Sequence, residues 1–131
     1  MKTLIVEDDF TSRLLLQELL KSYGPSHIAV NGKEAVEAVR LALEAGEPYN
    51  LICLDIMMPE MDGQEALRQI REQEEARGIL PSKGAKIVMT TALGDLKNVS
   101  AAYRNLCDAY LTKPIQKAKL LEELRKLGLI Q

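Results

Sequence analysis

The sequence predicts an α/β fold in which helices cover both faces of a parallel sheet. Five short runs are almost wholly apolar, which is typical of strands that are buried on both faces. Each of these runs is followed by a stretch whose apolar residues recur at helical spacing, which makes five such stretches. A regular alternation of strand and helix implies right-handed crossovers, and therefore a doubly wound parallel sheet.

The first half of the chain is expected to contain three strands and two helices. The strands are expected at 3–6, 27–30 and 50–54, and the helices at about 10–22 and 32–45. Gly24-Pro25 separates the first helix from the second strand. Asn31 with Glu34 resembles a capping box that opens the second helix, and Gly46 is typical of its end.

The second half is expected to contain two strands and three helices. The strands are expected at 85–89 and 108–111, and the helices at about 63–77, 95–106 and 115–127. The longest irregular piece is 72–84, which we expect to extend the third helix by a charged, solvated turn and then to loop back. It should lie away from the polar strand ends described below, and it is a candidate partner surface.

Length and composition limit the class of protein. With 131 residues the chain can bury a real core, and we expect one domain over 1–131 with no effector domain after it. The composition, 47% hydrophobic and 27% charged, is that of a soluble globular protein. The net charge of −2 provides no excess of positive charge for binding nucleic acid or an anionic membrane. No apolar stretch has the length of a membrane span, and no signal-peptide pattern opens the chain, so we expect a cytoplasmic protein. Cys53, Cys107 and the single His27 do not form a zinc-binding pattern.

Four polar islands directly follow apolar runs, at positions where strands are expected to end. They are Glu7-Asp8-Asp9, Asp55, Thr90-Thr91 and Lys113-Pro114. In a parallel sheet all the strand C-terminal ends lie along one edge, where open α/β folds bind ligands. We therefore expect carboxylates, a hydroxyl and an ammonium to converge there, a mixture that suits a divalent cation and a phosphoryl group.

The acidic residues of these islands predict a metal site. Carboxylates packed together repel each other, so at least one pKa should rise unless a cation lies among them. Mg²⁺ is the natural occupant, because it is a hard ion usually held by one or two carboxylates, waters and a phosphate. The alternative is that Glu7, Asp8 and Asp9 form only an acidic loop or cap the first helix.

Asp55 is the best-placed nucleophile of the chain. Pro59 and Gly63 bracket a tight loop, which we expect to hold the acid exposed at the sheet edge. An aspartate can accept a phosphoryl group as an acyl phosphate, and Lys113 and Thr91 match phosphoryl oxygens as cation and donor. Taken singly, Lys113 is typical of a solvated surface lysine and Thr91 of a turn residue, but their joint placement after the fourth and fifth strands favours the phosphoryl site.

These motifs together resemble the response regulator receiver domains, the CheY-like family of two-component signalling. The matching pieces are Leu4-Ile5-Val6-Glu7-Asp8-Asp9, Leu54-Asp55-Ile56-Met57-Met58-Pro59-Glu60-Met61-Asp62-Gly63, Met89-Thr90-Thr91-Ala92 and Tyr110-Leu111-Thr112-Lys113-Pro114. The resemblance covers essentially all of the chain. It implies a flavodoxin-like fold, with five parallel strands in the order 2-1-3-4-5 flanked by five helices.

The resemblance also implies a role for each metal-site residue. Asp8 and Asp55 are implied as direct ligands of Mg²⁺, with Mn²⁺ as an alternative ion, and the backbone carbonyl of Met57 as a third ligand. Glu7 is implied to act through a water molecule.

The remaining implied roles concern the phosphoryl group. Asp55 is implied as the phosphoryl acceptor, Thr91 as the hydroxyl that moves toward the phosphoryl group, and Lys113 as the cation that pairs with it. Tyr110 resembles the aromatic switch whose ring turns inward when Thr91 moves. The bond between Lys113 and Pro114 is expected to be cis.

The function implied is that of a stand-alone receiver, which accepts a phosphoryl group from a histidine kinase or a histidine phosphotransfer protein. Such a chain is not an enzyme with turnover, and it signals to a downstream protein through the face of helix four, strand five and helix five, as a monomer or as a phosphorylation-dependent dimer. Two alternatives stay open. One is a pseudo-receiver that only binds partners. The other is a Mg²⁺-dependent aspartyl phosphatase, although that class requires two aspartates separated by one residue, and in this chain Asp8 and Asp9 are adjacent.

Overall fold

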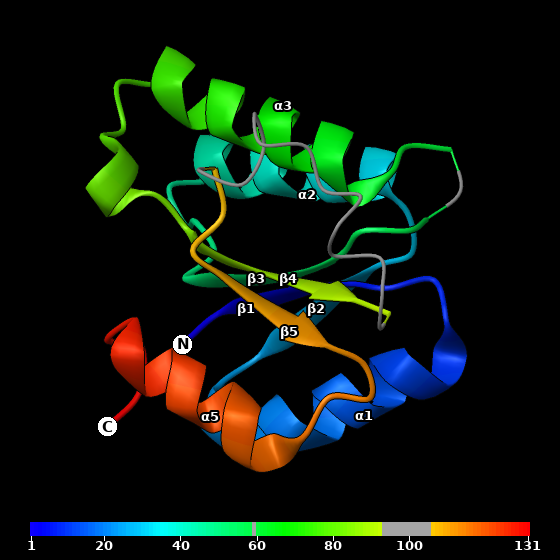
Figure 1. Ribbon diagram of the computed structural model, residues 1–131. Coiled ribbons are helices and arrows are strands. Elements are labelled where there is room, and N and C mark those ends of the chain that lie inside the picture. Colours follow the sequence, from blue (N-terminus) through cyan, green and yellow to red (C-terminus); the bar gives the residue numbers. More distant parts are fainter. Residues whose placement is uncertain (59, 93–105) are drawn as a thin grey trace.

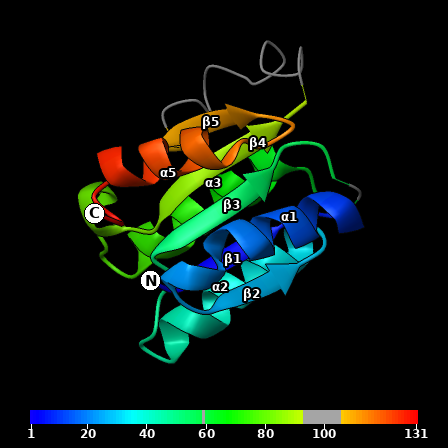
Figure 2. The same cartoon turned by 90° about the horizontal axis from the view of Figure 1, so that it is seen from below.

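The parallel sheet predicted from the sequence is present in the computed structural model, which describes residues 1–58, 60–92 and 106–131. Its five strands are β1 (Thr3–Val6), β2 (Ser26–Ala29), β3 (Leu51–Asp55), β4 (Lys86–Thr91) and β5 (Ala109–Thr112). They lie in the order β2-β1-β3-β4-β5, and all neighbouring pairs are parallel. The predicted strand order is therefore confirmed, and Figure 2 shows it across the width of the molecule.

Helices cover both faces of the sheet, as expected for a doubly wound fold. The described residues form α1 (Phe10–Leu20), α2 (Gly32–Glu44), α3 (Gly63–Ala76) and α5 (Lys117–Lys126), with short 3-10 turns at η1 (Lys21–Tyr23) and η2 (Pro81–Lys83). In Figure 1, α2 and α3 lie on one face and α1 and α5 on the other. The helix expected at 95–106 falls outside the described residues except for Leu106, which lies in a turn.

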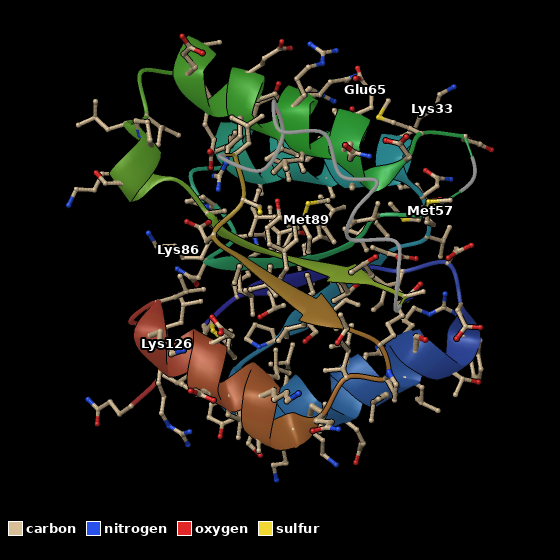
Figure 3. The ribbon with its side chains drawn as sticks, viewed as in Figure 1. Lys33, Met57, Glu65, Lys86, Met89 and Lys126 are labelled. Carbon is tan, nitrogen blue, oxygen red and sulfur yellow. The ribbon has the colours of Figure 1, made fainter. Side chains whose placement is uncertain are left out.

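Two apolar cores follow from this layering. In β3 the side chains alternate, so that Ile52 and Leu54 pack toward α2 and α3 while Leu51 and Cys53 pack toward α1 and α5. Met89 of β4 belongs to the first core, and Figure 3 shows it between the sheet and α3. Cys53 is buried, as the apolar run around it predicted.

Side-chain caps fix where three helices begin. The carboxylates of Asp9 and Asp62 and the amide oxygen of Asn31 each accept a hydrogen bond from the backbone N–H three residues later, at 2.8, 2.9 and 2.8 Å respectively. Such caps satisfy N–H groups that have no partner within the helix. Asp9 therefore caps α1.

The second strand and the capping box of α2 differ from the prediction by one residue. β2 ends at Ala29, whereas the apolar run predicted a strand through Val30. The Val30 N–H donates to the carboxylate of Glu34 at 3.0 Å, so the reciprocal bond of the box goes to Val30 and not to Asn31. The side chain of Val30, beyond the end of β2, is 38% exposed.

The segment after α3 loops back as predicted, but its charged turn is not fully solvated. α3 ends at Ala76, and η2 follows before β4 begins at Lys86. Glu74, expected in the solvated turn, is 5% exposed. Its carboxylate accepts hydrogen bonds from the guanidinium of Arg71 at 2.7 Å and from the N–H of Ala85 at 2.8 Å, which explains its burial.

No helix among the described residues is long and apolar enough to cross a membrane.

Candidate functional site

The three acidic residues singled out in the sequence lie together at the C-terminal edge of the sheet. β1 and β3 are neighbours with Val6 opposite Leu54, so Glu7, which follows β1, lies beside Asp55 at the end of β3. Carboxylate oxygens of Glu7, Asp8 and Asp55 lie within 4.8 Å of one another. Glu7 and Asp55 are buried and Asp8 is exposed.

The burial of Asp55 corrects the expectation that the loop after β3 holds it exposed. Asp55 is 4% exposed. Gly63, at the start of α3, lies so close that a Cβ there would be 2.2 Å from the Asp55 carbonyl oxygen. The Gly63 N–H also donates to the Ile56 carbonyl at 2.8 Å, so the loop folds back over the end of the strand.

Lys113 brings a positive charge into the carboxylate cluster. Its Nζ lies 2.5 Å from Oε1 of Glu7 and 3.4 Å from Oδ2 of Asp55. The backbone places it there, because Lys113 directly follows β5 and its N–H donates to the Thr91 carbonyl at 2.7 Å. The peptide bond between Lys113 and Pro114 is cis, as expected.

Charge in this cluster is only partly compensated. Burial, and then the neighbouring Glu7 carboxylate, raise the pKa of Asp55 to about 7, against the opposing effect of Lys113. Burial also acts to raise the pKa of Glu7, but the close approach of Asp55 and of the Lys113 ammonium outweighs it and lowers that pKa. The pKa of Lys113 is raised, because the two carboxylates outweigh the effect of its burial. The two buried acids thus share one lysine, and Asp55 is the one that is more easily protonated.

These residues fit a divalent cation. Oε1 of Glu7 is buried and has no hydrogen bond among the described residues, since the approach of Lys113 is a contact between charges outside hydrogen-bond geometry. A cation among the three carboxylates would take the place of the proton on Asp55. Oxygen ligands of this kind are those that Mg²⁺ uses in proteins. Met57, the other predicted ligand, is two residues beyond Asp55, and its N–H donates to Oδ1 of Asp55 at 3.4 Å.

The predicted switch residues lie on the two neighbouring strands. Thr91 is fully buried and is the last residue of β4, whereas the apolar run predicted a strand ending at Met89. Pairing of Thr91 with Thr112 of β5 keeps it in the ladder, and its hydroxyl donates to the Ala92 carbonyl at 3.2 Å. Tyr110 lies opposite Met89 in β5 and is half-buried. The roles of both stay predictions.

One residue near the site was not anticipated. Nη1 of Arg13 donates to the Glu7 carbonyl at 3.3 Å, and its guanidinium lies 5.4 Å from the centre of the Phe10 ring. It thus ties α1 to the segment that carries the acids. The sequence holds no signal for this, because an arginine in the first turns of a surface helix is ordinary.

Comparison with known proteins identifies the class that this fold and site define. The profile of the response regulator receiver domain matches residues 3–125, and the chain belongs to this family. It is 33% identical over 123 residues to the chemotaxis protein CheY of Halobacterium salinarum, covering 94% of this chain and 92% of that protein. It is 34% identical over 126 residues to the sensor histidine kinase GacS of Pseudomonas protegens, covering 95% of this chain but spanning only 13% of the kinase.

A solved structure is similar over the same extent. The receiver domain of the sensor histidine kinase PA1611 from Pseudomonas aeruginosa superposes with a TM-score of 0.75 at 27% identity, over 97% of each chain. That structure has a magnesium ion coordinated in its active site cleft. The protein is accordingly a CheY-like receiver domain of two-component signalling.

Proposed function

We propose that this receiver accepts a phosphoryl group on Asp55 from a histidine kinase or a histidine phosphotransfer protein, in a reaction that depends on Mg²⁺ or Mn²⁺. One observation carries the proposal. A buried carboxylate at a strand end lies within 4.8 Å of two further carboxylates and 3.4 Å from a lysine ammonium. Such a cluster can hold a divalent cation and neutralise a transferred phosphoryl group.

The chemistry follows from positioning and charge. An oxygen of Asp55 attacks the phosphorus of a phosphohistidine, the new O–P bond forms, and the N–P bond breaks with its electron pair left on the imidazole. Lys113 then pairs with phosphoryl oxygens, moving away from Glu7, and the Thr91 hydroxyl donates to another. Mg²⁺, when bound by Asp8, Asp55 and the Met57 carbonyl, would screen negative charge on the acceptor and the phosphoryl group. Hydrolysis by water releases inorganic phosphate and restores the carboxylate.

An exposed apolar surface beside the acids suits the phosphodonor. Phe10 and Leu14, one turn apart on α1, are 66% and 51% exposed, and Met57 after β3 is 62% exposed. Exposed large apolar residues around a polar site are typical of protein–protein contacts. We expect the histidine-bearing segment of the donor to dock on these residues, with its histidine directed at Asp55.

Output is proposed to pass through the face that contains β5 and α5. Phosphorylation adds negative charge beside Thr91 and Lys113, which lie at the ends of β4 and β5. Their movement toward the phosphoryl group would change the packing of Tyr110 in β5 and so the surface offered to a downstream protein.

The test is the intact mass of the protein after incubation with a small-molecule phosphodonor, with and without Mg²⁺. We expect the gain of one phosphoryl group, lost on chelation and absent in Asp55→Asn. No gain by a folded protein would favour the pseudo-receiver, and steady turnover of a generic phosphate ester would favour the phosphatase. With a phosphorylated histidine protein as donor, Leu14→Asp should slow transfer while leaving uptake from the small donor unchanged.

A further inference from the structure

The segment between α3 and β4 forms one wall of a groove that the phosphoryl site does not use. The groove has a volume of about 490 Å³ and lies between the end of α3, the loop around η2 and the residues that precede β5. Its apolar lining comes from Ile79, Leu80, Pro81 and Leu106. Leu80 is 64% exposed, so its side chain is available for contact.

The walls of the groove are held in place by a network centred on Arg71. The guanidinium donates to the Leu106 carbonyl at 2.8 Å, to the Ala85 carbonyl at 2.8 Å and to Glu74 at 2.7 Å. It also donates to Asp108 at 3.0 Å. These bonds join α3, the loop before β4 and the turn before β5, so the groove is formed before any partner arrives, and little ordering is needed on binding.

The groove carries net negative charge. Its charged lining residues are Arg71, Glu74, Glu75 and Asp108, three acids against one base. Arg71 is engaged by Glu74 and Asp108, and Glu75 is exposed with no ion pair among the described residues. The nearby Lys83 and Lys86 do not line the groove. A second copy of this chain is a poor occupant, because a two-fold interface would place one acidic rim against another.

The groove lies at the end of the sheet opposite to the phosphoryl site. β4 runs from Lys86 to Thr91, and five steps of about 3.3 Å separate its ends by about 17 Å. In Figure 3, Met57 and Lys86 mark these two ends. A partner in the groove would therefore leave the carboxylate cluster accessible to a phosphodonor.

We infer that this groove is a constitutive docking site for a basic, amphipathic segment of a partner protein. One large apolar side chain of the segment would contact Leu80 and Leu106, while a lysine or arginine pairs with Glu75. The contact is small and serves as a tether that holds the receiver beside a partner whether or not Asp55 is phosphorylated.

The test uses the full chain, labelled with ¹⁵N, and a synthetic probe. The probe is an amphipathic peptide of about 14 residues in which leucines occupy one helical face and lysines the rest, beside a leucine–glutamate peptide of the same pattern. We expect the lysine peptide to shift amide signals of 71–80 and 106–108, and the glutamate peptide to bind at least about tenfold more weakly. Leu80→Asp and Glu75→Lys change exposed residues and should leave the spectrum of the folded protein intact. Each should weaken the binding of the lysine peptide by about tenfold.

Matched variants separate this surface from the donor surface. Leu14→Asp makes the same change at an exposed leucine of α1, and Asp55→Asn removes the acceptor; both should leave binding of the lysine peptide in the groove unchanged. Leu80→Asp should in turn leave phosphoryl uptake unchanged. Equal binding of the two peptides, shifts confined to α1, or binding unaffected by Leu80→Asp would each overturn the inference.

Discussion

Replacing Arg71 by alanine should destabilise this protein far more than the same replacement of Arg68, one turn earlier in α3. Both arginines contact two carboxylates, but their surroundings differ. The side chain of Arg71 is 16% exposed and that of its partner Glu74 is 7% exposed. Arg68 is 41% exposed, and its partners Glu65 and Glu72 are 36% and 58% exposed.

The expected magnitude follows from this difference in burial. Removing one partner of a buried ion pair costs about 3 to 5 kcal/mol, because the remaining charge stays buried without compensation. In Arg71→Ala the charge left behind is that of Glu74, and the carbonyls of Ala85 and Leu106 also lose a donor. Exposed pairs contribute about 0 to 1 kcal/mol, so Arg68→Ala should cost no more than that. The loss of unfolding free energy in Arg71→Lys should lie between those of Arg71→Ala and Arg68→Ala, because an ammonium keeps the charge without the planar fork of donors.

The assay is urea unfolding at neutral pH, followed by circular dichroism, for the wild type and the three variants. We expect the free energy of unfolding to fall by about 3 to 5 kcal/mol in Arg71→Ala, with the denaturant slope unchanged. Adding Glu74→Gln to Arg71→Ala should restore part of the loss, since the uncompensated charge is then gone. If Arg71→Ala and Arg68→Ala differ by less than about 1 kcal/mol, burial does not set the strength of this pair and the reasoning fails.

Three further predictions concern the carboxylate cluster. In the metal-free protein, burial and Glu7 raise the pKa of Asp55 from 3.8 to about 7. Between these two pH values the folded protein binds a proton that the unfolded chain has lost, so the free energy of unfolding falls as the pH rises. Urea unfolding with a chelator should show a loss of about 2 to 3 kcal/mol between pH 5 and 8 that is absent in Asp55→Asn but present in Glu60→Gln, a control carboxylate in the next loop. Lys113→Ala should lower stability without Mg²⁺ and slow phosphoryl uptake, because two buried carboxylates then lack their cation; unchanged uptake by intact mass would contradict this. Gly63→Ala should cost more than about 2 kcal/mol, since its Cβ would lie 2.2 Å from the Asp55 carbonyl, whereas Gly46→Ala meets no atom within 4 Å and should cost only about 1 kcal/mol for its positive φ.

The sequence predicted the parts of this fold that depend on local pattern. Apolar runs located all five strands to within one or two residues, and the end of β3 at Asp55 and of β1 before Glu7 brought the acids to one edge. The strand order came from the family resemblance, because spacing alone leaves it open. The end of β2 at Ala29, one residue before the predicted end at Val30, lies within that margin.

The Arg71 network could not be predicted for a different reason. The run from Glu72 to Arg77 is rich in charged residues, which predicts that it is exposed to solvent, yet Glu74 within this run is buried. Its burial depends on a partner network that reaches Asp108, 37 positions further along the chain from Arg71. No periodicity reports such a contact, since it exists only after β4 and β5 have paired. The exposed Glu75 beside it follows the same pattern in the sequence, so pattern alone cannot tell the two apart.

The two charged clusters differ in how far hydrogen bonds compensate their carboxylates. In the Arg71 cluster the carboxylates of Glu74 and Asp108 accept backbone N–H groups at 2.8 Å in addition to the guanidinium. At the phosphoryl site the corresponding backbone N–H groups lie 3.3 Å from Glu7 and 3.4 Å from Asp55, and a single lysine serves both acids. Because short backbone bonds already satisfy the first cluster, a metal ion gains little there. In the second cluster the pKa of Asp55 is raised to about 7, and a divalent ion that takes the place of its proton would meet the full carboxylate charge. The degree of compensation therefore separates the carboxylate cluster at the sheet edge from the Arg71 cluster.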